Sequence, residues 1–173
     1  SSISESHSFS FAATRMIGEV LAEDGQFVEA LHYNREYLKL AQDVHDTVNI
    51  QRALATHAHT YISMSTQDPS FLSKALKYCN KCHEAIARIP SKDIDQKERC
   101  QMTGRALENI GRVRWRLGEL DLAETNFKEA EDRYRSYKLW PDIARLSQSR
   151  AFLTLESKSG DVTKALKQTE LCV

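Results

Sequence analysis

The spacing of small and large residues in the 106–137 stretch constrains this chain most. Gly111 and Ala123 are small enough to let two antiparallel helices cross closely. Gly118 lies between them, where a residue without a Cβ can adopt the left-handed conformation that ends a helix. Phe127 is large enough to fill the space between the two helices. The stretch therefore predicts a helical hairpin with a glycine at its turn.

The same pattern can be laid over the chain four times, at 10–46, 47–89, 92–137 and 139–173. The small residues expected at the helix crossings are 45, 48 and 42 residues apart, and they are Ala30, Ala75, Ala123 and Ala165. The offsets within the 106–137 stretch match those of the tetratricopeptide repeat, a helix–turn–helix unit of about 34 residues. The longer intervals here predict longer helices and connectors of variable length.

Apolar residues recur at three- and four-residue intervals almost throughout, and no alternating strand pattern is sustained. All three prolines fall between these segments, and Asp68-Pro69 is typical of a helix start. We therefore expect an all-α fold, a tetratricopeptide-type solenoid of about four hairpins (eight helices) in a right-handed superhelix. The fourth hairpin should turn at Gly160. Residues 1–9 read as a flexible serine-rich tail, and residues 10–173 as one array.

Composition excludes several classes of function. Lysine plus arginine and aspartate plus glutamate both number 24, so the formal net charge is zero. Residues 1–86 carry 7 basic and 10 acidic residues and residues 87–173 carry 17 and 14, so the halves differ only from −3 to +3. That gradient is too weak to predict nucleic-acid or membrane binding. No apolar run reaches the roughly 20 residues of a membrane span, and the N-terminus lacks the features of a secretory signal.

Cys79, Cys82 and His83 spell C-x-x-C-H, the pattern of haem c attachment. Both cysteines occupy core positions of the second repeat, however, where a free cysteine acts as a small hydrophobe. All four cysteines read as reduced intracellular thiols. His57 and His59 lie two residues apart and cannot share a helix face, so we expect His57 in the core and His59 in the groove. With no phosphate loop and no nucleophile motif, we expect no enzyme activity, no cofactor and no metal.

A solenoid of this kind presents its first helices on the concave face, so the groove can be assigned by register. The predicted groove residues are Arg15, Glu19, Glu23, Arg52, His59, Arg105, Glu108, Arg112, Trp115, Arg116 and Arg150. Glu19 and Glu23 lie one helical turn apart and could face a basic residue of a bound peptide, or form an ordinary solvated face. Trp115 could anchor a peptide or pack between hairpins. The sequence leaves both pairs of alternatives open.

Five ordered motifs suggest a family. They are EALHYNREYLKLA at 29–41, Asp46, QRA at 51–53, TY at 60–61 and NIGRVRWRLG at 109–118. Over about residues 12–170 this set resembles the tetratricopeptide region of Tonsoku-like proteins. The resemblance implies a nuclear, non-catalytic scaffold for DNA replication and repair. It implies a groove that binds the N-terminal tail of histone H3, in its replication-coupled variant, with other repair proteins bound by parts of the family absent here.

One alternative belongs to another functional class. A tetratricopeptide scaffold of the kinesin-light-chain or Pins-like kind, which holds partner proteins for transport or polarity, shares long helices and long repeat intervals. The chain departs from the Tonsoku-like pattern at His57-Ala58, where Leu-Gly is usual in the repeat. Recovery of bound partners from nuclear extract separates the two hypotheses, because the first predicts histones and replication factors and the second predicts cortical or motor proteins.

Overall fold

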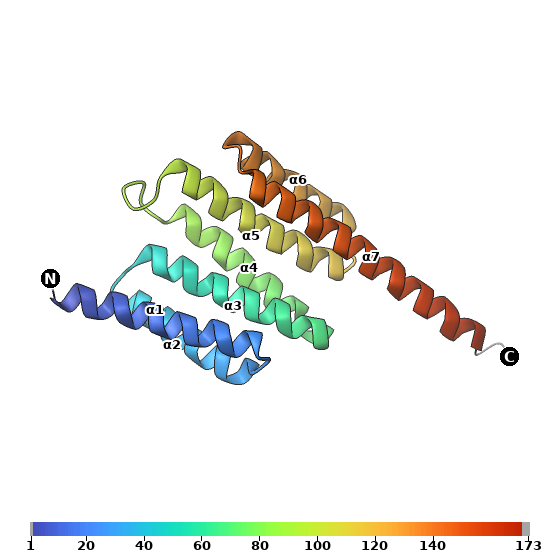
Figure 1. Cartoon of the computed structure of the whole chain (residues 1–173), viewed down its shortest axis with the longest axis horizontal. Helices are drawn as coiled ribbons and strands as arrows, with labels where there is room; N and C mark the ends of the chain where they lie inside the picture. The colour runs from blue at the N-terminus through green and yellow to red at the C-terminus, as the bar shows by residue number, and fades with distance from the viewer. Residues whose placement is uncertain (1, 171–173) are drawn as a thin grey trace.

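A computed structural model describes the backbone of residues 2–170 and the side chains of residues 10–159. The described chain contains helices only, so the prediction of an all-α protein is confirmed. Seven α-helices follow one another with one short 3₁₀ turn (Figure 1). They are α1 Ser2–Glu23, α2 Phe27–Asp43, α3 Thr47–Gln67, η1 Pro69–Phe71, α4 Leu72–Ala87, α5 Gln96–Arg116, α6 Leu120–Ser136 and α7 Trp140–Glu170.

Helices that are neighbours in sequence are also neighbours in space. The pairs α1/α2, α3/α4 and α5/α6 form hairpins, and α2 contacts α3 as α4 contacts α5. Helix α7 packs on α5 and α6. Figure 1 shows the three hairpins following one another in chain order, from blue to orange. Each hairpin thus buries its apolar face against the next one.

Glycines end the first helix of two hairpins, as predicted. Gly25 and Gly118 have φ of 77° and 81°, in the left-handed region that favours glycine. After α1, the Gly25 N–H donates to Ala22 O at 3.2 Å and the next N–H donates to the carbonyl of Leu21 at 2.8 Å, which satisfies carbonyls at the helix end. Aspartates cap helix starts: Asp68 accepts from Ser70 N at 2.9 Å, in the segment where the sequence predicted a cap.

Three of the predicted small residues are fully buried within the hairpins. Ala30, Ala75 and Ala123 are each 0% exposed. A Cβ placed on Gly111 would lie 2.6 Å from the ring of Phe127, which is itself 0% exposed. The hairpin geometry predicted for 106–137 is therefore present in α5 and α6.

The fourth copy differs from the prediction. Helix α7 continues unbroken from Trp140 to Glu170, so there is no turn at Gly160, and the expectation of eight helices is wrong. A glycine costs a helix interior only about 1 kcal/mol, and on its own it does not end a helix. Ala165 belongs to this helix, and its side chain lies outside the described ones. At the other end, α1 begins at Ser2, within the 1–9 segment expected to be a flexible tail.

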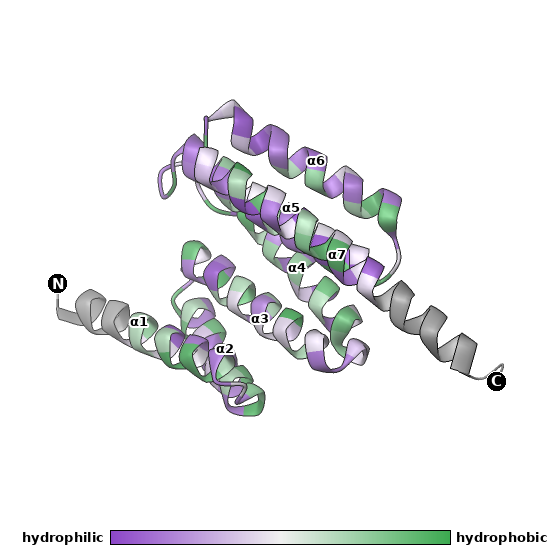
Figure 2. Ribbon diagram, turned by 45° about the vertical axis from the view of Figure 1, so that its right-hand side comes forward, coloured by the Kyte–Doolittle hydropathy of each residue, from purple (hydrophilic) through white to green (hydrophobic). Residues whose placement is uncertain are grey.

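Figure 2 shows α6 turning a largely hydrophilic face outwards. Apolar side chains are nevertheless exposed at both ends of the row of hairpins, for example Val20 on α1 and Phe152 on α7, at 55% and 61%. None of the described helices is both long and apolar enough to span a membrane.

Candidate functional site

A groove of about 730 Å³ lies along the first helices of the three hairpins, α1, α3 and α5. Among the described residues that line it, two come from second helices, Asn34 of α2 and Cys82 of α4. Six of the residues predicted from the repeat register meet there, and they are Arg15, Glu19, Glu23, Arg52, His59 and Arg105. First helices can line one groove because their second helices occupy the opposite side of each hairpin.

The charged groups at the groove differ in how far they are already paired. Arg15 Nη1 donates to both carboxylate oxygens of Glu19, at 2.8 and 2.9 Å. Arg105 lies 3.3 Å from a carboxylate oxygen of Asp142. Glu23 and Arg52 are exposed and form no ion pair within the described part of the chain. These two residues, rather than Glu19, therefore offer free charges to a ligand.

The floor of the groove is polar, which the repeat register did not predict. Asn34 is 1% exposed, and its Nδ2 donates to Thr60 Oγ1 at 2.9 Å. Its Oδ1 is buried without a hydrogen-bond partner and lies close to Gly18, where an added Cβ would approach it to 2.6 Å. Gln51 Nε2 donates to Cys82 Sγ at 3.2 Å. Asparagine and glutamine are mostly exposed in proteins. Their occurrence at positions that the helical period places inside was therefore the sequence signal that could have predicted a polar floor.

Glu108 does not face the groove, and this prediction is wrong. The residue is 3% exposed, between α5, α6 and α7. Its Oε2 accepts from Arg145 Nη2 at 2.8 Å and from the Tyr134 hydroxyl at 3.2 Å, and its Oε1 accepts from Ser149 Oγ at 3.1 Å. The repeat register predicts a groove position for this carboxylate because the register describes α5 alone and does not include the packing of α7.

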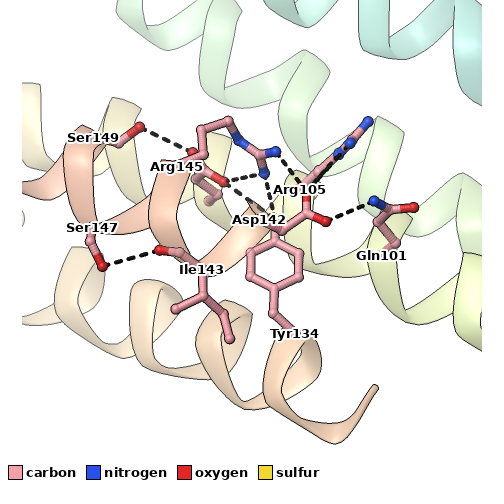
Figure 3. A network of polar contacts seen from close by, with 9 residues as sticks. Gln101, Arg105, Tyr134, Asp142, Ile143, Arg145, Ser147 and Ser149 are labelled. Atoms are coloured by element: carbon pink, nitrogen blue, oxygen red, sulfur yellow. Dashed lines mark hydrogen bonds and ion pairs between the residues drawn. The ribbon is translucent and has the colours of Figure 1, made fainter. Parts of the chain in front are cut away.

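Asp142 extends this network (Figure 3). It accepts from Arg145 Nη1 at 2.6 Å and from Gln101 Nε2 at 2.7 Å. Burial by itself would raise the pKa of Asp142, but the hydrogen bonds from Arg145 and Gln101 and the nearby Arg105 lower it below its usual value. The carboxylate is thus held ionised, and the network fastens α7 to α5.

The other predicted groove residues on α5 and α7 lie elsewhere. Trp115 is half-buried against the core cluster that contains Phe127 and Leu153, which is the packing alternative. Arg150 lies 2.6 Å from Glu124, with its guanidinium over the Phe127 ring. Arg112 and Arg116 lie on α5 beyond the residues that line the groove. The groove therefore ends near Arg105 and Asn109 on α5.

Cys79 and Cys82 are buried core residues, as predicted. Burial raises the pKa of Cys79 to about 12 and that of Cys82 to about 11, so both thiols stay protonated at neutral pH. Protonated thiols are poor metal ligands. Within the described residues, no group of three histidine, cysteine or acidic side chains could hold a metal ion.

His57 is buried in the core, at 2% exposure, and stacks on Tyr78 with a centroid distance of 4.8 Å. Burial lowers its pKa below 6.5, although a hydrogen bond with Ala53 O at 3.0 Å opposes the shift. The unfolded chain therefore binds a proton more readily than the folded chain. Stability should fall as the pH drops below about 6.5, at up to about 1.4 kcal/mol per pH unit for one proton.

We expect His57→Phe, which keeps an aromatic ring beside Tyr78, to flatten this acid-side slope. Urea unfolding followed between pH 7.5 and 5 measures it. His59→Phe at the exposed groove position is the matched control and should retain the wild-type slope. Equal slopes for the wild type and His57→Phe would exclude His57 as the responsible group.

Fold and groove together define an all-helical protein of stacked hairpins with a polar groove along its first helices. Comparison with protein-family models and with curated proteins found no match.

Proposed function

We propose that this protein is a non-catalytic, peptide-binding scaffold of the tetratricopeptide type, with its hairpins stacked as a right-handed superhelix. The groove along α1, α3 and α5 is the observation that carries the proposal, because such a solenoid presents its first helices to its ligand. The fully buried Ala30, Ala75 and Ala123, one in each hairpin, support a repeating packing unit.

The proposed ligand is an extended polypeptide segment. The groove is long and open, and amide side chains such as Gln51 and Asn109 border it. An amide group can donate and accept at once, as a peptide backbone does, so it suits an extended chain of varied sequence. The exposed carboxylate of Glu23 and the half-buried carboxylate of Glu98 add sites for lysine or arginine side chains.

The resemblance to Tonsoku-like proteins then suggests which segment binds. We propose the N-terminal tail of histone H3, in its replication-coupled variant, and a role in replication-coupled DNA repair in the nucleus. A lysine- and arginine-rich tail fits the end of the groove that contains Glu23. At the α5 end, Arg105 is held by Asp142, which limits its repulsion of a basic peptide. In this proposal, other replication and repair proteins bind to other parts of such a protein and not to this groove.

Calorimetric titration with an unmodified H3 tail peptide tests this function. Glu23→Lys should weaken binding about 3- to 10-fold, because a rim charge contributes on the order of 1 kcal/mol and reversal adds repulsion. Glu36→Lys makes the same charge change on α2 away from the groove, and should bind like the wild type. No heat of binding from the folded protein would contradict the proposed ligand. Equal losses in both variants would contradict the proposed groove.

A further inference from the structure

Two arginines on α5 lie just beyond the end of the groove. Arg105 and Asn109 line the groove, and Arg112 and Arg116 continue the same helix face at positions three and seven residues after Asn109. Side chains four apart on a helix are neighbours, and the charge of Arg116 acts on the guanidinium of Arg112. This face of α5 thus has two like charges side by side.

Neither guanidinium is well satisfied. Arg112 is half-buried and forms no hydrogen bond or ion pair with any described residue. The side chain of Arg116 is only 13% exposed, and its Nη1 is buried without a hydrogen-bond partner. Its one ionic contact with a described residue joins Nε to Glu156 Oε2 at 3.4 Å, longer than a good N–H···O bond. A buried donor without an acceptor costs about 1–3 kcal/mol, and more when it is charged.

Among the side chains of residues 10–159, Glu156 pairs with Arg116 and no carboxylate forms an ion pair with Arg112. Glu108 is four residues before Arg112, but both of its oxygens are already engaged by Arg145, Tyr134 and Ser149. Burial and the positive charge of Arg116 lower the pKa of Arg112, and the nearby charge of Glu108 opposes this shift only in part. A position in the last turn of α5 favours Arg116 through the helix dipole, but Arg112 lies more than a turn before the helix end and gains little from it.

We propose that Arg112 and Arg116 form a binding site for an oxyanion, a phosphate or carboxylate group, beside the end of the groove. Two planar guanidinium groups can each donate paired N–H bonds to such a group, which is the geometry that arginine provides and lysine does not. The anion would neutralise Arg112 and compensate the charge of Arg116. The site stands independently of the proposed histone ligand. A polypeptide in the groove could reach it with a phosphorylated or acidic side chain.

Titration of the full chain with inorganic phosphate at constant ionic strength tests the site. The readout is the NMR signals of the arginine Nε–H groups, assigned by substitution. We expect saturable shifts of the Arg112 and Arg116 signals, and a loss of affinity of roughly 10-fold or more in Arg112→Gln and in Arg116→Gln. Arg133→Gln, on the exposed face of α6, is the control and should bind phosphate like the wild type.

Two further measurements make the outcome decisive. Because Arg112 has no hydrogen-bond or ion-pair partner among the described residues, Arg112→Gln should fold with an unchanged or higher Tm, so lost binding will not reflect unfolding.

A phosphoserine peptide and its serine counterpart identify the source of the anion. Preference for the phosphopeptide assigns the anion to a bound polypeptide, and equal binding of the two peptides assigns it to free phosphate. The proposal is overturned if phosphate causes no saturable shift, or if Arg133→Gln loses as much affinity as the two α5 variants.

Discussion

Replacement of Phe127 by alanine is expected to lower the free energy of unfolding by about 3–5 kcal/mol. The ring is 0% exposed and fills the space between α5 and α6, against Gly111. Truncation removes its buried apolar surface and leaves a cavity that the close helix crossing cannot easily collapse. Urea denaturation followed by circular dichroism at 222 nm measures the loss.

Phe152→Ala provides a matched control for this prediction. Phe152 is 61% exposed on α7, so the same truncation should change stability by less than about 0.5 kcal/mol. A small effect at Phe127, or equal effects at the two sites, would show that the α5/α6 crossing is not the core of the fold.

Glu108→Gln should also destabilise the protein, by about 1–3 kcal/mol. The substitution keeps the shape of the side chain but removes the charge that Arg145 Nη2 contacts at 2.8 Å. Breaking a fully buried ion pair costs about 3–5 kcal/mol. The expected loss is smaller here because the Arg145 side chain is 40% exposed and can be solvated in part. The loss of stability should be greatest in α7, because this network holds α7 against α5.

Hydrogen exchange tests where stability is lost. In Glu108→Gln the amides of α7 next to Asp142 and Arg145 should exchange faster than in the wild type, while those of α3 remain protected. Glu129→Gln removes an exposed carboxylate that lies 3.7 Å from Arg133, and should change stability by less than about 0.5 kcal/mol. Uniformly faster exchange throughout Glu108→Gln would contradict a local role in docking α7.

Local sequence signals predicted the hairpins well because the forces that act on them are local. Gly25 and Gly118 end helices through their own backbone freedom, and both lie at positive φ. Ala123 and Gly111 had to be small wherever two helices cross, and Cys79 could be assigned to the core from helical register alone. Register also identified the half of the groove that α1 and α3 provide.

Residues whose environment depends on a distant helix could not be placed in this way. Glu108 appeared to be an exposed groove residue until α7 was seen to bring Arg145 and Ser149 to it. The sequence allowed Trp115 either to face the groove or to pack between hairpins. The structure shows that it packs against the core cluster formed by α5, α6 and α7. The polar floor at Asn34 and Gln51 likewise depends on contacts between helices that are far apart in sequence.

The sequence by itself thus determined that the chain is helical, that α1 and α5 end at Gly25 and Gly118, and that Ala30, Ala75 and Ala123 are buried small residues, because helix propensity, capping and period act within a few residues. Tertiary structure alone decided that α7 continues as one helix, that Glu108 is buried and paired, and that Arg116 Nη1 is buried without a hydrogen-bond partner among the described residues. Burial and charge pairing are properties of the space between elements, and no local pattern specifies which distant side chains share that space.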